Sequence, residues 1–563
     1  MKNRFTAANC KIALIAAALA LCAGHDTARA DERSELEQLR ATTMSLIEAL
    51  VETGAITREK ADKLIQAAEQ KAKERVAQSA SAGTAAASPA EVGADGRKIV
   101  RVPYVPESVR REIREQVKQD VMAQAKEERW ANPNVLPEWL DRFTFEGDLR
   151  LRYDGYKLDP TNTPSGPSAK TITRAADFYN NTGNPTFNTQ EDYSRTRLRA
   201  RFGFTAKISD MVSAGMLIST GSTSGPTSTN QTIGQNFNKY SLGLDRGFIA
   251  LKPTPTLTLT GGRFANPFMG TDLVWAEDLN FEGVVASYKP QLTPNFGAFL
   301  TAGWFPLRTD NPLQTVPANL TGGQAGIDWN LSPRSRLKIG AALYQYHGIV
   351  GAQETDARYN GGTSVADYGA TQYPAGLRQR GNTLFAINSP ADLAAGNPLI
   401  WGLASDFREL NLTGNLDIST FGENHVLLIG DYVNNLAFNR AQMAVRTGNT
   451  IIDGKSAGYL GKLLVGQPLI RNAGEWNVSL AYRWLGSDAV LDAYTNSDFG
   501  LGGTNNKGYI LGANYGLDRQ TWLSVRWMAS NLIDSMVPST TGAAATPTKL
   551  STDLLQVDLN VKF

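Results

Sequence analysis

The sequence predicts an all-β barrel of about sixteen antiparallel strands that crosses a membrane, preceded by a helical region. Two observations lead to this fold class. The chain ends on a strand with one apolar and one polar face. Segments with the two-residue period of a strand recur from Phe143 onward, and the connections between them alternate between long and short.

The last ten residues, 554–563, alternate apolar and polar side chains up to the terminal Phe563. Because side chains alternate across a strand, one face would meet lipid and the other a watery lumen, and the last strand would pair with the first to close a barrel. A strand that ends on an aromatic residue resembles the signal read by the barrel assembly machinery, so we expect Phe563 to be an assembly signal. The alternative is an ordinary amphipathic edge strand.

The first thirty residues have the pattern of a signal peptide. Lys2, Arg4 and Lys11 accompany an apolar run from Ile12 to Ala23, and the small-residue site Ala28-Arg29-Ala30 follows. The apolar run is too short to span a bilayer, so we expect cleavage after Ala30 and a mature chain that crosses the membrane only as strands.

Both cysteines, Cys10 and Cys22, lie in the segment to be removed, which excludes disulfides and cysteine-based metal sites from the mature chain. A lipoprotein signal is the alternative reading of Cys22, but Leu21 precedes it where a small residue is required. Removal of four basic residues and one acidic residue changes the net charge from +2 to about −1. This balance gives no indication of a nucleic-acid partner, and we expect neither a metal nor a cofactor.

The chain divides into segments of different composition. Residues 31–78 have apolar side chains at helical spacing and are expected to form a helical hairpin or a short coiled coil. Residues 79–98 are rich in Ala, Ser and Gly and read as a flexible linker. Residues 99–140 hold an extended segment, a charged helix and a Pro-containing connector, and residues 141–563 are assigned to the barrel.

Sixteen strands are predicted, with an uncertainty of two. They start near Phe143, Arg195, Val212, Asp245, Thr256, Asn280, Phe296, Gln324, Arg336, Arg408, His425, Lys455, Glu475, Gly508, Gln520 and Leu554. Eight long connections alternate with seven short turns, as in an outer-membrane barrel with long external loops and short periplasmic turns. This arrangement predicts the outer membrane as the location and places the N-terminal region in the periplasm.

Aromatic residues support the same fold. In the strand near Glu475, Trp476 and Trp484 share one face and lie about 20 Å apart along the membrane normal, at ~3.3 Å per residue and a ~40° tilt. This separation suits aromatic girdles at the two membrane interfaces. A soluble β-sandwich would bury such a face.

Several motifs resemble those of the putative porins of Gram-negative outer membranes. They are Val102-Pro-Tyr-Val-Pro106, Pro137-Glu-Trp139, Gly147-Asp148-Leu-Arg150-Leu-Arg152, Gly262-Arg263-Phe264, Asn266-Pro267-Phe268 and Trp275 to Gly283. The resemblance covers most of the mature chain and implies a water-filled channel for passive diffusion of small polar solutes or ions, surrounded by outer-membrane lipids. By analogy with other porins, a homotrimer is a further expectation.

The second strand places four arginines on one face. A lipid-facing arginine costs about 2–4 kcal/mol near the membrane midplane, so these side chains are expected to line the lumen beside two arginines of the first strand. The predicted basic wall consists of Arg150, Arg152, Arg195, Arg197, Arg199 and Arg201. Two roles remain open for it, solute selection and structural bracing by Glu146 and Asp148 on the same wall.

The third long connection carries Asp272, Trp275, Glu277 and Asp278. In the general porins the third loop folds into the barrel, so the resemblance implies a constriction in which acidic groups face the basic wall. The alternative is a surface loop. Gly261-Gly262, just before it, predicts a bulge that turns Arg263 inward.

Two other functional classes are alternatives to a channel. A barrel enzyme is disfavoured because only His347 and His425 remain in the mature chain, predicted at opposite ends of the barrel and without a serine motif. We therefore expect no enzymatic activity. A structural tether, in which the N-terminal helices contact the cell wall, is supported only by the linker.

Overall fold

The computed structural model describes residues 140–162, 188–222, 225–309, 316–354, 371–374, 376–395, 399–448, 455–534, 536–537, 546–547 and 549–563. They belong to one of the two compact units of the chain, residues 129–563. The predicted signal peptide, helical hairpin or coiled coil, linker and charged helix lie outside the described residues.

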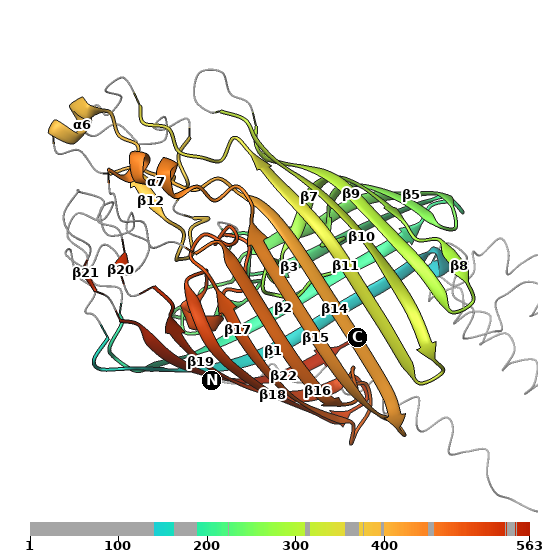
Figure 1. Ribbon diagram of the computed structural model, residues 1–563. Coiled ribbons are helices and arrows are strands. Elements are labelled where there is room, and N and C mark those ends of the chain that lie inside the picture. The colour runs from blue at the N-terminus through green and yellow to red at the C-terminus, as the bar shows by residue number, and fades with distance from the viewer. Residues whose placement is uncertain are drawn as a thin grey trace, which may run out of the picture. The chain divides into compact units, whose positions relative to one another are not determined.

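Within the described residues, sixteen long strands form one closed antiparallel barrel (Figure 1). They are β1 (Phe143–Leu158), β2 (Tyr193–Lys207), β3 (Val212–Thr220), β5 (Leu242–Thr254), β6 (Leu257–Ala265), β7 (Asn280–Tyr288), β9 (Phe296–Arg308), β10 (Ala318–Ser332), β11 (Ser335–His347), β14 (Arg408–Phe421), β15 (Asn424–Asn435), β16 (Ala457–Gly466), β17 (Trp476–Leu485), β18 (Asn506–Asp518), β19 (Thr521–Leu532) and β22 (Ser551–Lys562). Each pairs with its neighbours in chain order, so the predicted strand count and the barrel are confirmed.

The barrel closes where the last strand pairs with the first. β22 runs antiparallel to β1 with Leu559 opposite Leu151. Beyond the end of β22, the Phe563 N–H donates to the Gly147 carbonyl at 3.0 Å, and the Gly147 N–H donates to the Phe563 carbonyl at 2.9 Å. The terminal residue therefore takes part in the closure of the barrel.

The long connections gather at one end of the barrel, here called the loop end, and the short turns at the other, the turn end (Figure 1). Four connections matter below and are named L2 (221–241), L3 (266–279), L5 (348–407) and L7 (486–505). The remaining short elements are η2 (Leu140–Arg142), β4 (Gln231–Thr232), β8 (Gln291–Thr293), β12 (Leu384–Ala386), α6 (Pro390–Ala394), β13 (Trp401–Leu403), α7 (Arg440–Thr447), η4 (Phe499–Leu501), β20 (Met536–Val537) and β21 (Thr546–Pro547). No helix within the described residues is long and apolar enough to cross a membrane.

The two faces of the barrel wall differ as the alternation predicts. On β22 the outward Leu555 and Leu559 are each 41% exposed, whereas the inward Asp558 is 7% exposed. On β1 the outward Leu149 and Leu151 are likewise exposed. An exposed apolar belt around a polar interior is the arrangement that a bilayer requires of a barrel.

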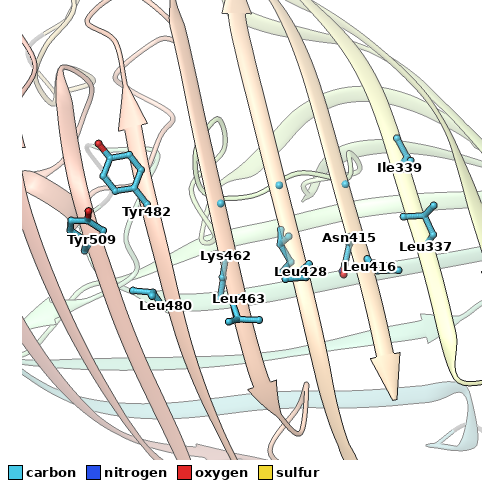
Figure 2. A pocket seen from close by; sticks show the side chains of 14 residues that line it. Leu337, Ile339, Asn415, Leu416, Leu428, Lys462, Leu463, Leu480, Tyr482 and Tyr509 are labelled. Carbon is cyan, nitrogen blue, oxygen red and sulfur yellow. The ribbon is translucent and has the colours of Figure 1, made fainter. Parts of the chain in front are cut away.

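A shallow apolar hollow lies on the outer face of the wall. Three glycines of successive strands, Gly414, Gly430 and Gly461, are register partners there, and a Cβ atom on any of them would meet open space. The hollow has a volume of about 640 Å³, and Figure 2 shows Leu428 and Leu463 beside it. Because it opens toward lipid, it is no part of a path through the lumen.

Inside the barrel, an apolar cluster fills much of the loop end. L3, L5 and L7 contribute to it together with inward side chains of β7, β9 and β11. Its buried aromatic members are Phe264, Phe268, Trp275, Phe281, Phe305, Tyr344, Tyr346, Tyr373 and Phe407. This packing holds three connections in the interior and leaves polar side chains on the side formed by β1, β2, β19 and β22.

Candidate functional site

The inward faces of β1 and β2 carry a cross-strand arrangement of arginine and aspartate. Arg150 lies opposite Arg199, and Arg152 lies opposite Arg197. Aspartates occupy the rows above and below them, with Asp148 opposite Arg201 and Asp154 opposite Arg195. We call Arg150, Arg152, Arg195, Arg197, Arg199 and Arg201 the arginine ladder.

Aspartates on the barrel wall neutralise part of the ladder. Asp148 accepts from Arg199 Nε at 2.9 Å and from Arg201 Nε at 2.7 Å. Asp154 accepts from Arg195 Nε at 3.1 Å. Arg197 Nε lies 2.7 Å from the same carboxylate, close enough for an ion pair although not aligned for a hydrogen bond.

Asp558 of β22 neutralises a further rung. It binds Arg152 through both carboxylate oxygens, each at 2.7 Å. Such a bidentate pair fixes the guanidinium plane, so this rung is rigidly held.

L3 crosses the interior of the barrel to reach the ladder. At its start, Met269 exchanges two backbone hydrogen bonds of 2.7 Å with the Gln324 side chain on β10. Thr271 then donates to Asp431 on β15, a strand nearly opposite β2 in the barrel order. At its far end, Asp278 lies 3.2 Å from Arg199 Nη1 and 3.4 Å from Arg201 Nη1.

Asp278 is well suited to hold L3 against the ladder. Burial alone would raise the pKa of its carboxyl, but the guanidinium groups of Arg199, Arg150 and Arg201 outweigh burial and hold that pKa below its usual range. The carboxylate is therefore charged at neutral pH, and L3 is tied to the wall by charge-assisted contacts.

L7 reaches the same ladder through Asp498. Its Oδ2 accepts from Arg152 Nη1 at 2.9 Å and from Gln556 Nε2 at 3.1 Å. Arg526 Nη2 of β19 lies 3.6 Å away. Although burial acts to raise the pKa of Asp498, Arg152 and Arg526 hold it below the usual value. L3 and L7 therefore both contact the arginine ladder, through Asp278 and Asp498.

L3 and L7 also bind each other. The Asp272 carbonyl accepts from the Asn496 N–H at 3.3 Å, and its carboxylate accepts from the Asn496 side-chain amide at 2.5 Å. The Ala276 N–H donates to the Tyr494 carbonyl at 2.7 Å. The two loops therefore form one structure within the barrel.

A polar recess remains between the ladder and these loops. Its lining is Arg150, Arg152, Ser228, Asn230, Asp272, Ala276, Glu277, Asp278, Asn496, Ser497, Asp498 and Arg526. Its cavity volume is about 50 Å³, room for only a few water molecules. L2 supplies Ser228 and Asn230, and the Asn230 side chain accepts from Arg150 Nη2 at 2.6 Å.

The structure separates the residues predicted on the third connection. Asp272, Glu277 and Asp278 line the recess, whereas Trp275 does not. Trp275 is 3% exposed and packs edge-on against Phe281 and Tyr344 in the apolar cluster. The burial of Trp275 is not predictable from its acidic neighbours in the sequence. It follows from the fold of the loop, which turns its apolar side away from the ladder.

The predicted bulge at Gly261-Gly262 is wrong. The register of β6 is continuous with both neighbours there, and Arg263 lies 2.8 Å from its register partner Glu282. The irregularity lies instead at Asp245 on β5, where the pairing with β3 shifts. Gly262 has φ 115°, and a Cβ there would lie 2.4 Å from the carbonyl of a β5 residue, so close backbone approach explains the glycine.

No pattern in the sequence indicates Asp498 or Asn230 as site residues. Asp498 follows a stretch without strand period, and its partner Arg152 is 346 residues away. The histidines are remote from the recess: His347 ends β11 at the loop end, and His425 begins β15 at the turn end, 2.6 Å from Asp417. Among the described residues, no group of His, Cys, Asp and Glu could hold a metal ion.

Comparisons with solved structures return outer-membrane barrels at low similarity. The outer membrane channel DcaP of Acinetobacter baumannii is 10% identical, with 74% of this chain and 96% of that chain covered and a TM-score of 0.35. OprB of Pseudomonas putida is 11% identical, with 76% and 96% covered and a TM-score of 0.39. OmpF of Salmonella typhi, in a complex with daunomycin, is 9% identical, with 75% and 97% covered and a TM-score of 0.37.

No curated protein matches the sequence. The model of one protein family, described as "Putative porin", matches residues 40–563, which include the whole barrel. The match covers the ladder, the interior loops and the closing strand. The chain therefore belongs to the putative porin family.

Proposed function

We propose that this outer-membrane porin passes small polar solutes through the recess between the arginine ladder and the loops L3 and L7. One observation carries the proposal: carboxylates of two of the interior loops, Asp278 of L3 and Asp498 of L7, are ion-paired to the ladder. Apolar side chains fill the neighbouring part of the interior. The polar protein surface that water and polar solutes can follow therefore lies along the ladder.

The recess combines small size with dense charge. Its lining holds three arginines and four carboxylates in a cavity of about 50 Å³. Confined water screens charge poorly, so a solute there feels individual side chains rather than an average field. Structural bracing and solute selection are then two roles of the same ladder, since the arginines that hold the loops also form one wall of the passage.

Enlarging one side chain in the recess tests this assignment. Ser497→Trp should lower single-channel conductance in planar bilayers severalfold, because an indole exceeds the space available. Ser209→Trp, in an exposed turn at the turn end, is the matched control and should leave conductance unchanged. Equal conductance of both variants, each assembled as a barrel, would place the main path elsewhere.

Finer expectations about the rest of the chain belong to the same proposal. An even number of strands brings both ends of the barrel to the turn end, which supports a periplasmic location for the residues before β1. Residues 1–30 are proposed to be removed as a signal peptide, and the helical region to contact the cell wall or to stabilise a homotrimer. Phe563 is proposed as the residue read by the assembly machinery.

A further inference from the structure

The charged groups of the recess divide into those already engaged with protein partners and those that are not. Arg152 is bound by Asp558 and Asp498. Asp278 is bound by two ladder arginines, and Asp272 accepts from an asparagine amide. These groups hold the loops in place and have little capacity left for a solute.

Arg150 is different. It is 8% exposed, it has no carboxylate within ion-pair distance among the described residues, and its single hydrogen bond within those residues goes to the neutral Asn230 side chain. Its Nε is buried without a partner. A buried guanidinium with unused donors is costly unless something else binds it.

Glu277 lines the same recess as Arg150 and is its counterpart of opposite charge. It is exposed, lines the recess from L3, and makes no ion pair or hydrogen bond within the described part of the chain. The neighbouring Asp278 points to the ladder, so Glu277 is the L3 carboxylate left facing the passage.

We propose that Arg150 and Glu277 together bind small zwitterionic solutes, with the solute carboxylate at Arg150 and its ammonium group at Glu277. This rests on the proposed function and names the solute class of the same recess. A simple anion would meet Arg150 but also the uncompensated carboxylate of Glu277. A simple cation would meet Glu277 but also Arg150, so a solute with both charges fits best.

The neutral groups of the recess suit the same solute. Ser228 and Ser497 offer hydroxyls. The Asn230 side-chain amide donates to the Ser228 hydroxyl at 3.1 Å and keeps its second N–H for a solute. A carboxylate that reaches Arg150 Nε would satisfy the buried donor that the protein leaves open. The space of about 50 Å³ restricts the solute at this level to a group of a few atoms.

Swelling of proteoliposomes in isosmotic glycine and glycolamide tests the inference, because these isomers have the same atoms and only glycine is zwitterionic. The rate of glycine entry relative to glycolamide should exceed one in the parent protein. It should fall to about one in Arg150→Gln and in Glu277→Gln, with glycolamide entry within about twofold of the parent. Arg336→Gln, which removes an ion-paired arginine at the turn end, is the matched control and should keep the parent ratio.

The outcomes distinguish failure of the zwitterion site from failure of the proposed function. A parent ratio of one, with glycolamide entry that Ser497→Trp blocks, overturns the zwitterion site and leaves the proposed function intact. Glycolamide entry that Ser497→Trp does not affect overturns the proposed function itself. Faster glycine entry in Glu277→Gln together with slower entry in Arg150→Gln would identify an anion site and overturn the inference. If Arg150→Gln fails to show the heat-modifiable gel mobility of a folded barrel, Glu277→Gln and Arg150→Lys carry the test, and Arg150→Lys should keep a ratio above one.

Discussion

Replacing Asp498 with asparagine should release L7 from the arginine ladder. The variant loses the charge-assisted hydrogen bond from Arg152 Nη1, now 2.9 Å long. Arg152 keeps both bonds to Asp558, whereas Arg526 loses the carboxylate 3.6 Å away and keeps its hydrogen bonds to the Gln556 side chain. The cost is therefore at least that of one charged hydrogen bond, about 1.5–3 kcal/mol. Since each 1.4 kcal/mol is a factor of ten, the ratio of undocked to docked L7 should rise about ten- to a hundredfold.

Single-channel recording of Asp498→Asn should show this shift as more frequent transitions to a larger conductance. The zero-current potential in a salt gradient should also move in the anion-selective direction, because one negative charge is lost beside the ladder. Asp328→Asn is the matched control, since it breaks a similar arginine pair, with Arg336 at 2.6 Å, at the turn end. An assembled Asp498→Asn channel with the noise and zero-current potential of the parent would show that Asp498 does not hold L7 against the ladder.

Four further predictions concern other parts of the chain. Asp278 and Asp498 have lowered pKa values, so their contribution to loop docking is complete above the ordinary aspartate pKa of about 3.9 and is lost as the pH falls through the lowered values; channel noise should be constant from about pH 7 to pH 4 and rise only at more acidic pH. Deletion of Phe563 should reduce assembly into the outer membrane, measured by heat-modifiable mobility, much more than deletions within residues 31–131, because it removes two backbone hydrogen bonds to β1; normal assembly without it would contradict its role as the signal. Deletion of residues 31–131 should leave single-channel conductance nearly unchanged, because the barrel closes without them; a large change would mean that this region lines or plugs the channel. Gly430→Ala should stabilise the barrel by about 0.5–1 kcal/mol in denaturant unfolding, since alanine costs less chain entropy than glycine and its Cβ meets open space; a destabilised variant would show that the hollow is occupied.

The barrel could be predicted because each strand carries its own signal. The polar and apolar faces of β22 alternate without a break. The sequence pattern predicts a start at Gln324, but β10 begins at Ala318. The pattern misses the first residues because Gly322 and Gly323 interrupt the apolar alternation there. The local pattern therefore predicts the existence of a strand more accurately than the residues at which the strand begins and ends.

The site could be predicted only where it lies on strands. Four alternating arginines on β2 can face only the lumen, since their lipid-facing cost is prohibitive. L7 has no such period, so its entry into the barrel and the pairing of Asp498 with Arg152 depend on contacts between residues far apart in the chain. The division of the lining into engaged and free charges is likewise a property of packing, and Arg150 looks the same as Arg152 in the sequence.

Thiol labelling of the recess tests most directly whether solutes pass along the ladder. The expected mature chain has no cysteine, because Cys10 and Cys22 both precede residue 31, so Ser497→Cys would carry a single thiol in the recess. A bulky methanethiosulfonate reagent added during single-channel recording should cut the conductance of Ser497→Cys in one step per channel, and should leave Gly430→Cys, on the lipid face, unchanged. Undiminished conductance of Ser497→Cys after complete modification, measured by mass spectrometry, would contradict a path through the recess.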